Sequence, residues 1–147
     1  MKTFENLDAF QAAIDMTVTI YEVTEAFPAS ERYGLQAQMR RAGVSVISNI
    51  AEGQGRLTNG EWRQSLSHAR GSLYEIEAQL IIARRLHFIE EKDAAKLRTA
   101  CRRTGKALAG LITYVRNLER QPATGNRQPR INEEDRPRSR PQPEQQP

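Results

Sequence analysis

The residues that most often carry catalysis or bind metals are scarce in this sequence. It contains two histidines, His68 and His87, and a single cysteine, Cys101. Di-iron sites in helical bundles need Glu-x-x-His motifs, but Ser65 and Arg84 stand three positions before the histidines. The metalloprotease H-E-x-x-H, the nucleophile-elbow G-x-S-x-G and the P-loop motifs are also missing. We therefore expect no catalytic residue, no metal, no cofactor and no small-molecule substrate.

Arginine and lysine offer another chemistry, because they can neutralise the phosphates of a nucleic acid. Arg98, Arg102 and Lys106 are four positions apart, on one side of a predicted helix that continues through Arg116. Arg103 adjoins this row, and earlier helices add Arg40, Arg41, Arg63 and Arg70. The alternative is an ordinary solvent-facing surface, paired with acids such as Glu75, Glu77, Glu90 or Glu91. Exposed aromatic residues for base stacking are not evident, which argues against the reading of single strands.

The segment between residues 40 and 56 holds the least ordinary polar residues. Asn49 falls near the apolar stripe of its predicted helix, where a polar side chain needs hydrogen-bond partners. Glu52 and Arg56 are four positions apart, a spacing that suits an ion pair on a helix. We expect a structural polar network between the second and third helices, made of Asn49, Glu52, Arg56, Ser72 and Glu75. The turn Gly53-Gln54-Gly55 is open to two interpretations, a simple helix C-cap or a weak anion site formed by backbone N–H groups.

These side chains must be positioned by helices, since four stretches repeat apolar residues every three or four positions and none alternates as a strand does. The predicted helices cover residues 8–27, 33–52, 58–86 and 90–118. Thr58 and Glu61 have the spacing of a capping box, which marks the start of the third helix. Four long helices with short connections predict an all-α fold, an antiparallel up-down-up-down four-helix bundle.

The apolar residues of these helices predict both a core and a subunit interface. In the first helix the predicted core stripe consists of Phe10, Ile14, Val18 and Tyr21, with Thr17 in the same row. The second and third helices each carry an additional apolar strip, which a monomeric bundle does not need. We expect a homo-oligomer whose interface includes Val44, Ile47 and Ala51 on the second helix and Tyr74, Ala78, Ile81 and Ile82 on the third. The alternative is an unusually wide core contact.

Composition divides the 147 residues into a body and a tail. Six of the seven prolines lie after Gln121, whereas every aromatic residue lies before it. We therefore predict one folded domain over residues 1–120 and a disordered tail rich in Pro, Arg and Gln over residues 121–147. The formal net charge of +4 is mildly basic, and the body carries 17 basic against 14 acidic residues. Neither an export signal nor an apolar span long enough for a membrane is visible, so we expect a cytoplasmic protein.

Three separated motifs occur in order along the chain. The first is Glu31-Arg32-Tyr33-Gly34-Leu35, the second runs from Arg40 to Arg56 as RRAGVSVISNIAEGQGR, and the third is Ala69, Gly71, Ser72 and Glu75 followed by Gln79-Leu80. These motifs resemble those of the 23S rRNA-intervening sequence proteins, also called the S23 ribosomal protein family, over about residues 3–118. Two departures, Gly43 in place of alanine and Val46-Ile47 in place of Ile-Pro, concern only local helix packing.

The resemblance implies an up-down four-helix bundle that assembles as a ring-like pentamer. A similar bundle, the accessory protein of diversity-generating retroelements, binds a reverse transcriptase and nucleic acid through a basic surface. By analogy, the implied RNA-facing residues are Arg40, Arg41, Arg56, Arg63, Arg70, Arg98, Arg102, Arg103, Lys106 and Arg116. We therefore expect a non-enzymatic homo-oligomer that binds RNA or a ribonucleoprotein partner. The alternative is a protein-interaction scaffold without nucleic-acid binding.

Overall fold

The computed structural model describes residues 3–121, and within them every long element is a helix. The four helices are α1 (Asp8–Thr24), α2 (Leu35–Gln54), α3 (Asn59–Arg85) and α4 (Glu91–Arg120), and short 3-10 turns lie at Phe4–Asn6 (η1) and Ala29–Glu31 (η2). The predicted all-α fold is confirmed, and each helix lies within a few residues of its predicted position. The predicted tail lies, from residue 122 onward, outside the described residues.

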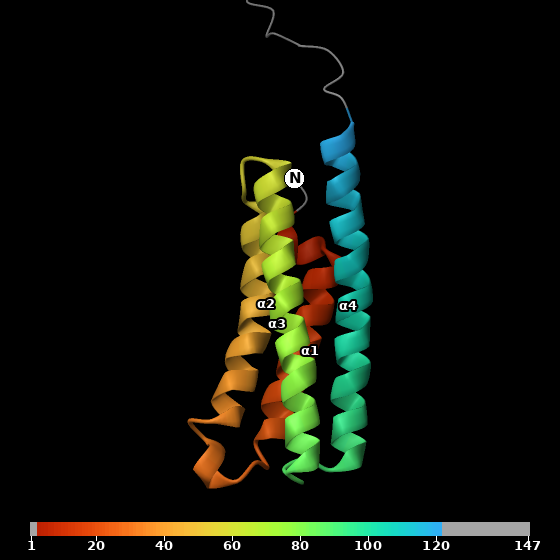
Figure 1. Ribbon diagram of the computed structural model, residues 1–147. Coiled ribbons are helices and arrows are strands. Elements are labelled where there is room, and N and C mark those ends of the chain that lie inside the picture. The colour runs from red at the N-terminus through yellow and green to blue at the C-terminus, as the bar shows by residue number, and fades with distance from the viewer. Residues whose placement is uncertain (1–2, 122–147) are drawn as a thin grey trace, which may run out of the picture.

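The helices form a bundle with an up-down-up-down course (Figure 1). α1 packs against α2 and α4, and α3 packs against the same two neighbours, so α1 and α3 are diagonally opposite. One cluster of buried apolar residues joins all four helices, and it includes Met16, Met39, Leu66, Ile76 and Leu97. Hollows lie on the outside of the bundle between α1 and α4, between α2 and α3, and between α3 and α4.

Local interactions fix where α3 begins and ends. The predicted capping box is confirmed, since Thr58 Oγ1 accepts from the Glu61 N–H and the Glu61 carboxylate accepts from the Thr58 N–H, both at 3.2 Å. At the other end, the Phe88 N–H donates to the Ala83 carbonyl at 2.9 Å, and His87 has a φ of 56°. This is a Schellman cap, in which glycine is the usual residue at the left-handed position. The cap turns the chain so that α4 runs back along α3.

The buried face of α1 differs from the predicted stripe. Val18 and Tyr21 are exposed, and Phe10 and Ile14 are only partly buried, although Thr17 is buried as expected. The residues that α1 buries include Ala9, Ala12, Ala13, Met16 and Ile20. The stripe prediction was wrong because it followed the largest apolar side chains, whereas alanines let a helix lie close to its neighbours in a densely packed interior.

The close approach of α1 and α2 is consistent with the face that α1 buries. A Cβ atom added at Gly43 would lie 3.0 Å from Thr17 Oγ1 and 3.1 Å from Ile20 Cδ1. Because Gly43 has no side chain, α2 leaves room for Thr17 and Ile20 to point into the bundle. Successive helical residues turn by about 100°, so Val18 and Tyr21 then point outward.

Candidate nucleic-acid interface

Half of the ten predicted basic residues form ion pairs with acids of the same chain. The pairs are Arg40–Glu25 (3.0 Å), Arg56–Glu52 (3.8 Å), Arg63–Glu119 (2.8 Å), Arg98–Glu91 (3.5 Å) and Arg103–Asp15 (2.7 Å). The nearby carboxylates offset the charge of these arginines. They therefore attract a phosphate chain less strongly than unpaired cations would.

Arg40 is the most extensively bound of the paired arginines. Its Nε donates to Thr24 Oγ1 at 3.0 Å, and its Nη2 donates to the Tyr21 carbonyl at 3.2 Å and to the Glu25 carboxylate at 3.0 Å. The guanidinium also lies 4.5 Å from the centre of the Tyr21 ring, a cation–π arrangement. Arg40 therefore links α2 to the C-terminal end of α1. Because these contacts occupy its guanidinium, we assign it a structural role rather than a role in ligand binding.

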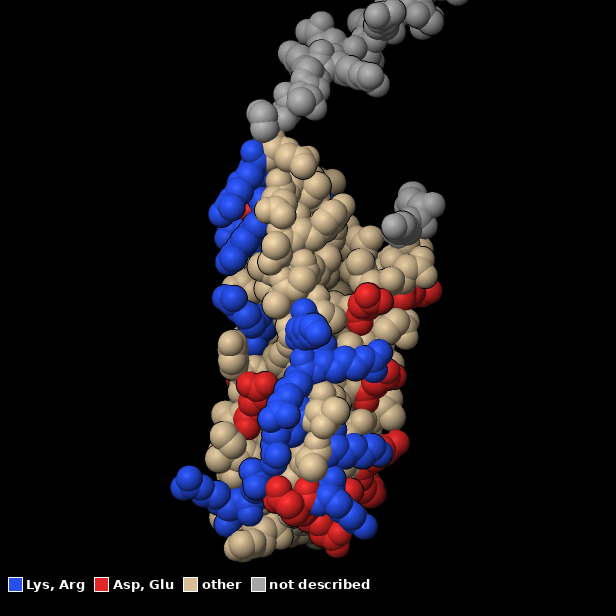
Figure 2. Space-filling model, turned by 90° about the vertical axis from the view of Figure 1, so that its right-hand side faces the viewer, with Lys and Arg blue, Asp and Glu red and all other residues tan. Residues whose placement is uncertain are grey.

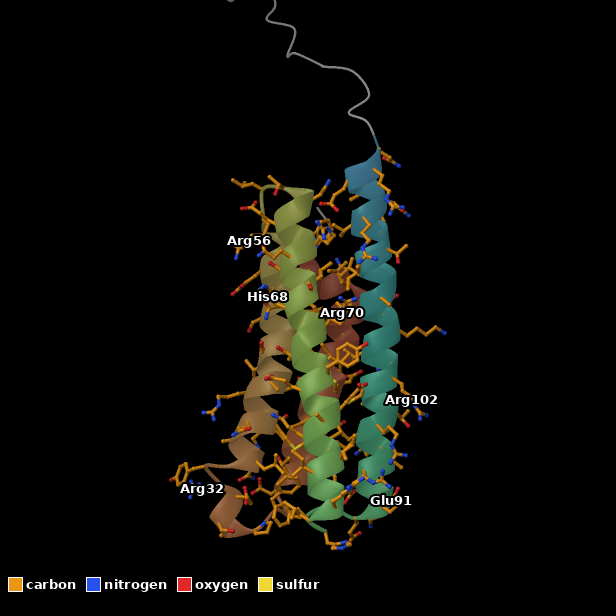
Figure 3. The ribbon with its side chains drawn as sticks, viewed as in Figure 1. Arg32, Arg56, His68, Arg70, Glu91 and Arg102 are labelled. Carbon is orange, nitrogen blue, oxygen red and sulfur yellow. The ribbon has the colours of Figure 1, made fainter. Side chains whose placement is uncertain are left out.

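The other five predicted residues, Arg41, Arg70, Arg102, Lys106 and Arg116, make no ion pair or hydrogen bond with any residue from 3 to 121. Arg41 lies on α2, and the other four lie on α3 and α4. Figure 2 shows lysine and arginine side chains running along α4, with fewer acidic side chains, which gather mainly toward one edge and the lower end. Arg102 points from α4 away from the bundle (Figure 3). We call Arg70, Arg102, Lys106 and Arg116 the free basic surface.

A groove between α3 and α4 brings two of these cations together with an aromatic ring. The groove has a volume of about 350 Å³, and its rim includes Arg70, Tyr74 and Glu77 from α3 and Arg116 from α4. Its floor consists of the buried apolar residues Leu73, Leu108 and Ile112. Arg70 lies between α3 and α4 in the view of Figure 3. We call this feature the α3–α4 groove.

Exposed aromatic residues are present, contrary to the expectation from the sequence. Tyr33, Tyr74 and Tyr114 are 85%, 64% and 55% exposed. The helical period of α3 separated Tyr74 from the core, but it could not show that α4 places Arg116 on the rim of the same groove. The combination of Tyr74 with free cations therefore could not be predicted from α3 alone.

The structure connects two of the five predicted network residues, Asn49 and Ser72, through Ser45, which was not among the predicted residues. Ser45 Oγ lies 2.9 Å from Ser72 Oγ, and Asn49 Nδ2 donates to the Ser45 carbonyl at 2.9 Å and to Ser45 Oγ at 3.2 Å. The other three lie apart from this chain: Glu52 pairs with Arg56, and exposed Glu75 has no hydrogen-bond partner among residues 3–121. The spacing of Ser45 and Asn49, one helical turn, was the available signal.

Two further hollows lie between other pairs of helices, and Lys106 of the free basic surface borders the second of them. A polar cleft of about 340 Å³ between α2 and α3 is bordered by Asn49, Arg56, Gln64 and His68, and Figure 3 shows Arg56 and His68 on the side of α3 away from α4. A largely apolar hollow of about 570 Å³ between α1 and α4 is bordered by Ala12, Ala107 and Gly110. Across residues 3–121, no group of three or more His, Cys, Asp or Glu side chains is placed to hold a metal ion.

Cys101 lies inside the bundle and is free of any disulfide. Burial, with a smaller contribution from the negative charge of Glu77, raises the pKa of the Cys101 thiol to about 12. The thiol is therefore neutral at physiological pH, whereas nucleophilic cysteines react as thiolates.

None of the described helices is long and apolar enough to cross a membrane.

The predicted interface residues lie on two different sides of the bundle. Val44, Tyr74, Ala78, Ile81 and Ile82 are exposed, whereas Ile47 and Ala51 are partly buried. Val44 follows Arg40 by one helical turn, and Arg40 contacts α1, so Val44 lies on the side of α2 that faces α1. Tyr74 lies at the α3–α4 groove, and Ile81 follows it by two turns on the same side. We call Val44, Ile47 and Ala51 the α2 strip, and Ile81 with Ile82 the α3 strip.

Comparisons with known proteins give a family from a family model and a fold from a solved structure. A family model described as 23S rRNA-intervening sequence protein matches residues 5–110. A crystal structure of a protein of unknown function from the S23 ribosomal protein family of Bacteroides thetaiotaomicron has a similar fold, with a TM-score of 0.66. It shares 18% identity, over 71% of this chain and 95% of that chain, a level at which the likeness shows the fold alone. None of the curated proteins matches this chain.

Proposed function

The chain belongs to the 23S rRNA-intervening sequence protein family, and from this membership and its free basic surface we propose that it is a non-enzymatic, homo-oligomeric bundle that binds RNA. The observation that carries the proposal is the free basic surface itself, Arg70, Arg102, Lys106 and Arg116 on α3 and α4. The family is named for sequences that intervene in 23S rRNA, so RNA is the polymer to test first. We place this activity in the cytoplasm.

Unpaired cations favour phosphate binding because their contact with a nucleic acid releases counterions into solution. An arginine that already pairs with a carboxylate, such as Arg103 with Asp15, must give up that pair before it gains a phosphate. In a plot of log affinity against log salt concentration, four phosphate contacts correspond to a slope of about −3 for a single strand and about −4 for a duplex. Steep dependence on salt is therefore the signature of this mode of binding.

The test is a titration of the full chain against a labelled, structured RNA at about 50 mM and 200 mM salt, the range over which phosphate contacts weaken strongly. We expect binding at the lower concentration and a large loss at the higher one. The double variant Arg102→Glu, Lys106→Glu should weaken binding at least tenfold. Arg41→Glu, which reverses an unpaired cation on another side of the bundle, is the matched control and should have a much smaller effect.

The two apolar strips support a ring rather than a two-fold dimer. A two-fold dimer uses the same patch on both subunits, whereas a closed ring joins two different patches of successive subunits. The α2 strip and the α3 strip are different patches on different sides of the bundle. They fit a heterologous ring, and the family resemblance suggests five subunits.

The exposed strips also favour a second candidate, a protein-interaction scaffold without nucleic-acid binding. In that case the strips and the apolar hollow between α1 and α4 would serve partner proteins. An oligomer that binds no RNA at low salt would favour the scaffold over the RNA-binding proposal.

A further inference from the structure

We propose that the α3–α4 groove binds an unpaired nucleotide of a single-stranded nucleic acid, with its base stacked on Tyr74 and the adjoining phosphates on Arg70 and Arg116. The inference rests on the proposed function. It narrows the expected ligand from any RNA that offers phosphates to a single strand that offers an unpaired base. It differs from the sequence-based expectation, which placed Tyr74 in a subunit interface.

Among the exposed tyrosines, Tyr74 is the one whose ring makes no aromatic or cation–π contact with the described residues. The ring of Tyr21 is covered by the Arg40 guanidinium at 4.5 Å, and Arg32 lies 5.7 Å from the ring centre of Tyr33. Tyr114 makes an edge-to-face contact with Trp62 at 6.3 Å. No aromatic or cation–π contact engages Tyr74 within residues 3–121, although its side chain is 64% exposed on the rim of a groove. An exposed ring of this kind is a stacking platform for bases.

The charged side chains around Tyr74 make the two ends of the groove electrostatically different. Arg70 stands one helical turn before Tyr74 on α3, and Arg116 reaches the same groove from α4. Neither guanidinium has an ion-pair partner among the described residues, so both are free to contact phosphates. Glu77, the one acid on the groove, stands on the opposite side of Tyr74 from Arg70 along α3. Phosphates are therefore favoured at the Arg70 end, and the amino groups of a base are favoured near Glu77.

The shape and lining of the groove suit an unpaired base rather than a duplex. Its volume of about 350 Å³ lies in the range of small-ligand sites, and buried leucine and isoleucine side chains form its floor. On α4 the rim residues Gly105 and Ala109 are small, which keeps the groove open beside Tyr74. In a duplex the faces of the bases are already stacked, so a duplex can offer only its phosphates and groove edges. An unpaired base can use the ring, the apolar floor and the cations together.

The test measures the binding of the full chain by fluorescence anisotropy at one low salt concentration. The probes are a 12-nucleotide oligoadenylate RNA, the corresponding DNA, and a blunt-ended RNA duplex of 12 base pairs. We expect the single strands to bind more tightly than the duplex. Tyr74→Ala should weaken single-strand binding at least fivefold, as expected for the loss of one stacked base, and should leave duplex binding unchanged. Tyr74→Phe should retain the affinity because the ring remains, and Tyr33→Ala is the matched control.

The outcomes separate this inference from the proposed function. If Tyr74→Ala has no effect while Arg102→Glu, Lys106→Glu still weakens binding, the stacking site is wrong and the basic surface stands. If the native chain binds none of the probes, both are wrong. If Tyr74→Ala lowers the oligomer mass in light scattering, Tyr74 belongs to the subunit interface and the inference fails. Equal affinity for RNA and DNA strands supports it, because the faces of the bases are common to both.

Discussion

Arg40 and Arg41 are adjacent on α2, yet their surroundings differ completely. Arg40 binds Thr24, Tyr21 and Glu25, whereas Arg41 is exposed and unpaired within residues 3–121. We expect Arg40→Ala to lower the free energy of unfolding by about 1.5–3 kcal/mol, the range for hydrogen bonds to a charged group. Arg41→Ala should change it by less than about 0.5 kcal/mol. Urea unfolding followed by circular dichroism measures both values, and equal effects would contradict the structural role assigned to Arg40.

The positions of the cations could be predicted from the sequence, but their pairing could not. Helical spacing correctly placed Arg98, Arg102 and Lys106 on one helix. It could not show that Arg103 pairs with Asp15 on α1, because that pair depends on which helices become neighbours. For the same reason, the α3–α4 groove was not predictable from either helix alone.

At the scale of the helices, Gly53 marks a close contact between the end of α2 and the start of α3. A Cβ atom added at Gly53 would lie 2.7 Å from Trp62 Cδ1, too close for any real contact. Gly53→Ala should therefore displace the Trp62 ring and cost about 1–3 kcal/mol of stability, as overpacking does. Trp62 is the only tryptophan, so a change in intrinsic fluorescence reports the displacement directly.

Gly55→Ala is the control for this variant. An added Cβ at Gly55 would meet only the Glu52 carbonyl at 3.5 Å, an ordinary contact, and Gly55 has a helical φ of −82°. We expect its stability and fluorescence to stay near those of the native chain. Loss of stability in both variants would mean that glycine is needed at the end of α2 for reasons other than Trp62.

The extent of each helix could be predicted well, whereas the face it buries could be predicted only in part. Apolar periodicity and the capping box at Thr58 located all four helices. The stripe on α1 was misplaced because Ala9 and Ala13 contribute little to an apolar pattern but are buried. A glycine on another helix, Gly43, leaves the space that Thr17 and Ile20 of α1 occupy. Helix orientation thus depends on the shape of the neighbouring helix.

At the scale of the whole molecule, the two apolar strips predict how subunits join. Val44→Glu should block the α2 strip, and Ile82→Glu should block the α3 strip; both positions are exposed in the single chain. In a heterologous ring each variant alone should lose assembly, because every contact needs one strip of each kind. A 1:1 mixture should form a dimer through the two intact strips. Light scattering of the separate and mixed variants measures these masses.

A two-fold dimer gives the opposite result for the mixture. If each strip met its own copy, the variant with the intact strip would dimerise alone, and mixing would create no new species. The same measurement would then replace the ring with a two-fold assembly.

The buried thiol of Cys101 makes this bundle suited to measurements of its own opening. It is the only cysteine in the chain, and its pKa of about 12 in the folded state keeps it protonated. A thiol reagent at neutral pH should therefore modify the native protein only when the helices separate, at a rate set by the free energy of opening. Modification as fast as that of a free thiol would contradict the burial of Cys101. The raised pKa also favours folding fully below about pH 9, and this contribution is lost as the pH rises through about 12. Labelling kinetics on unmodified protein would thus rank the stability of every variant above without an added probe.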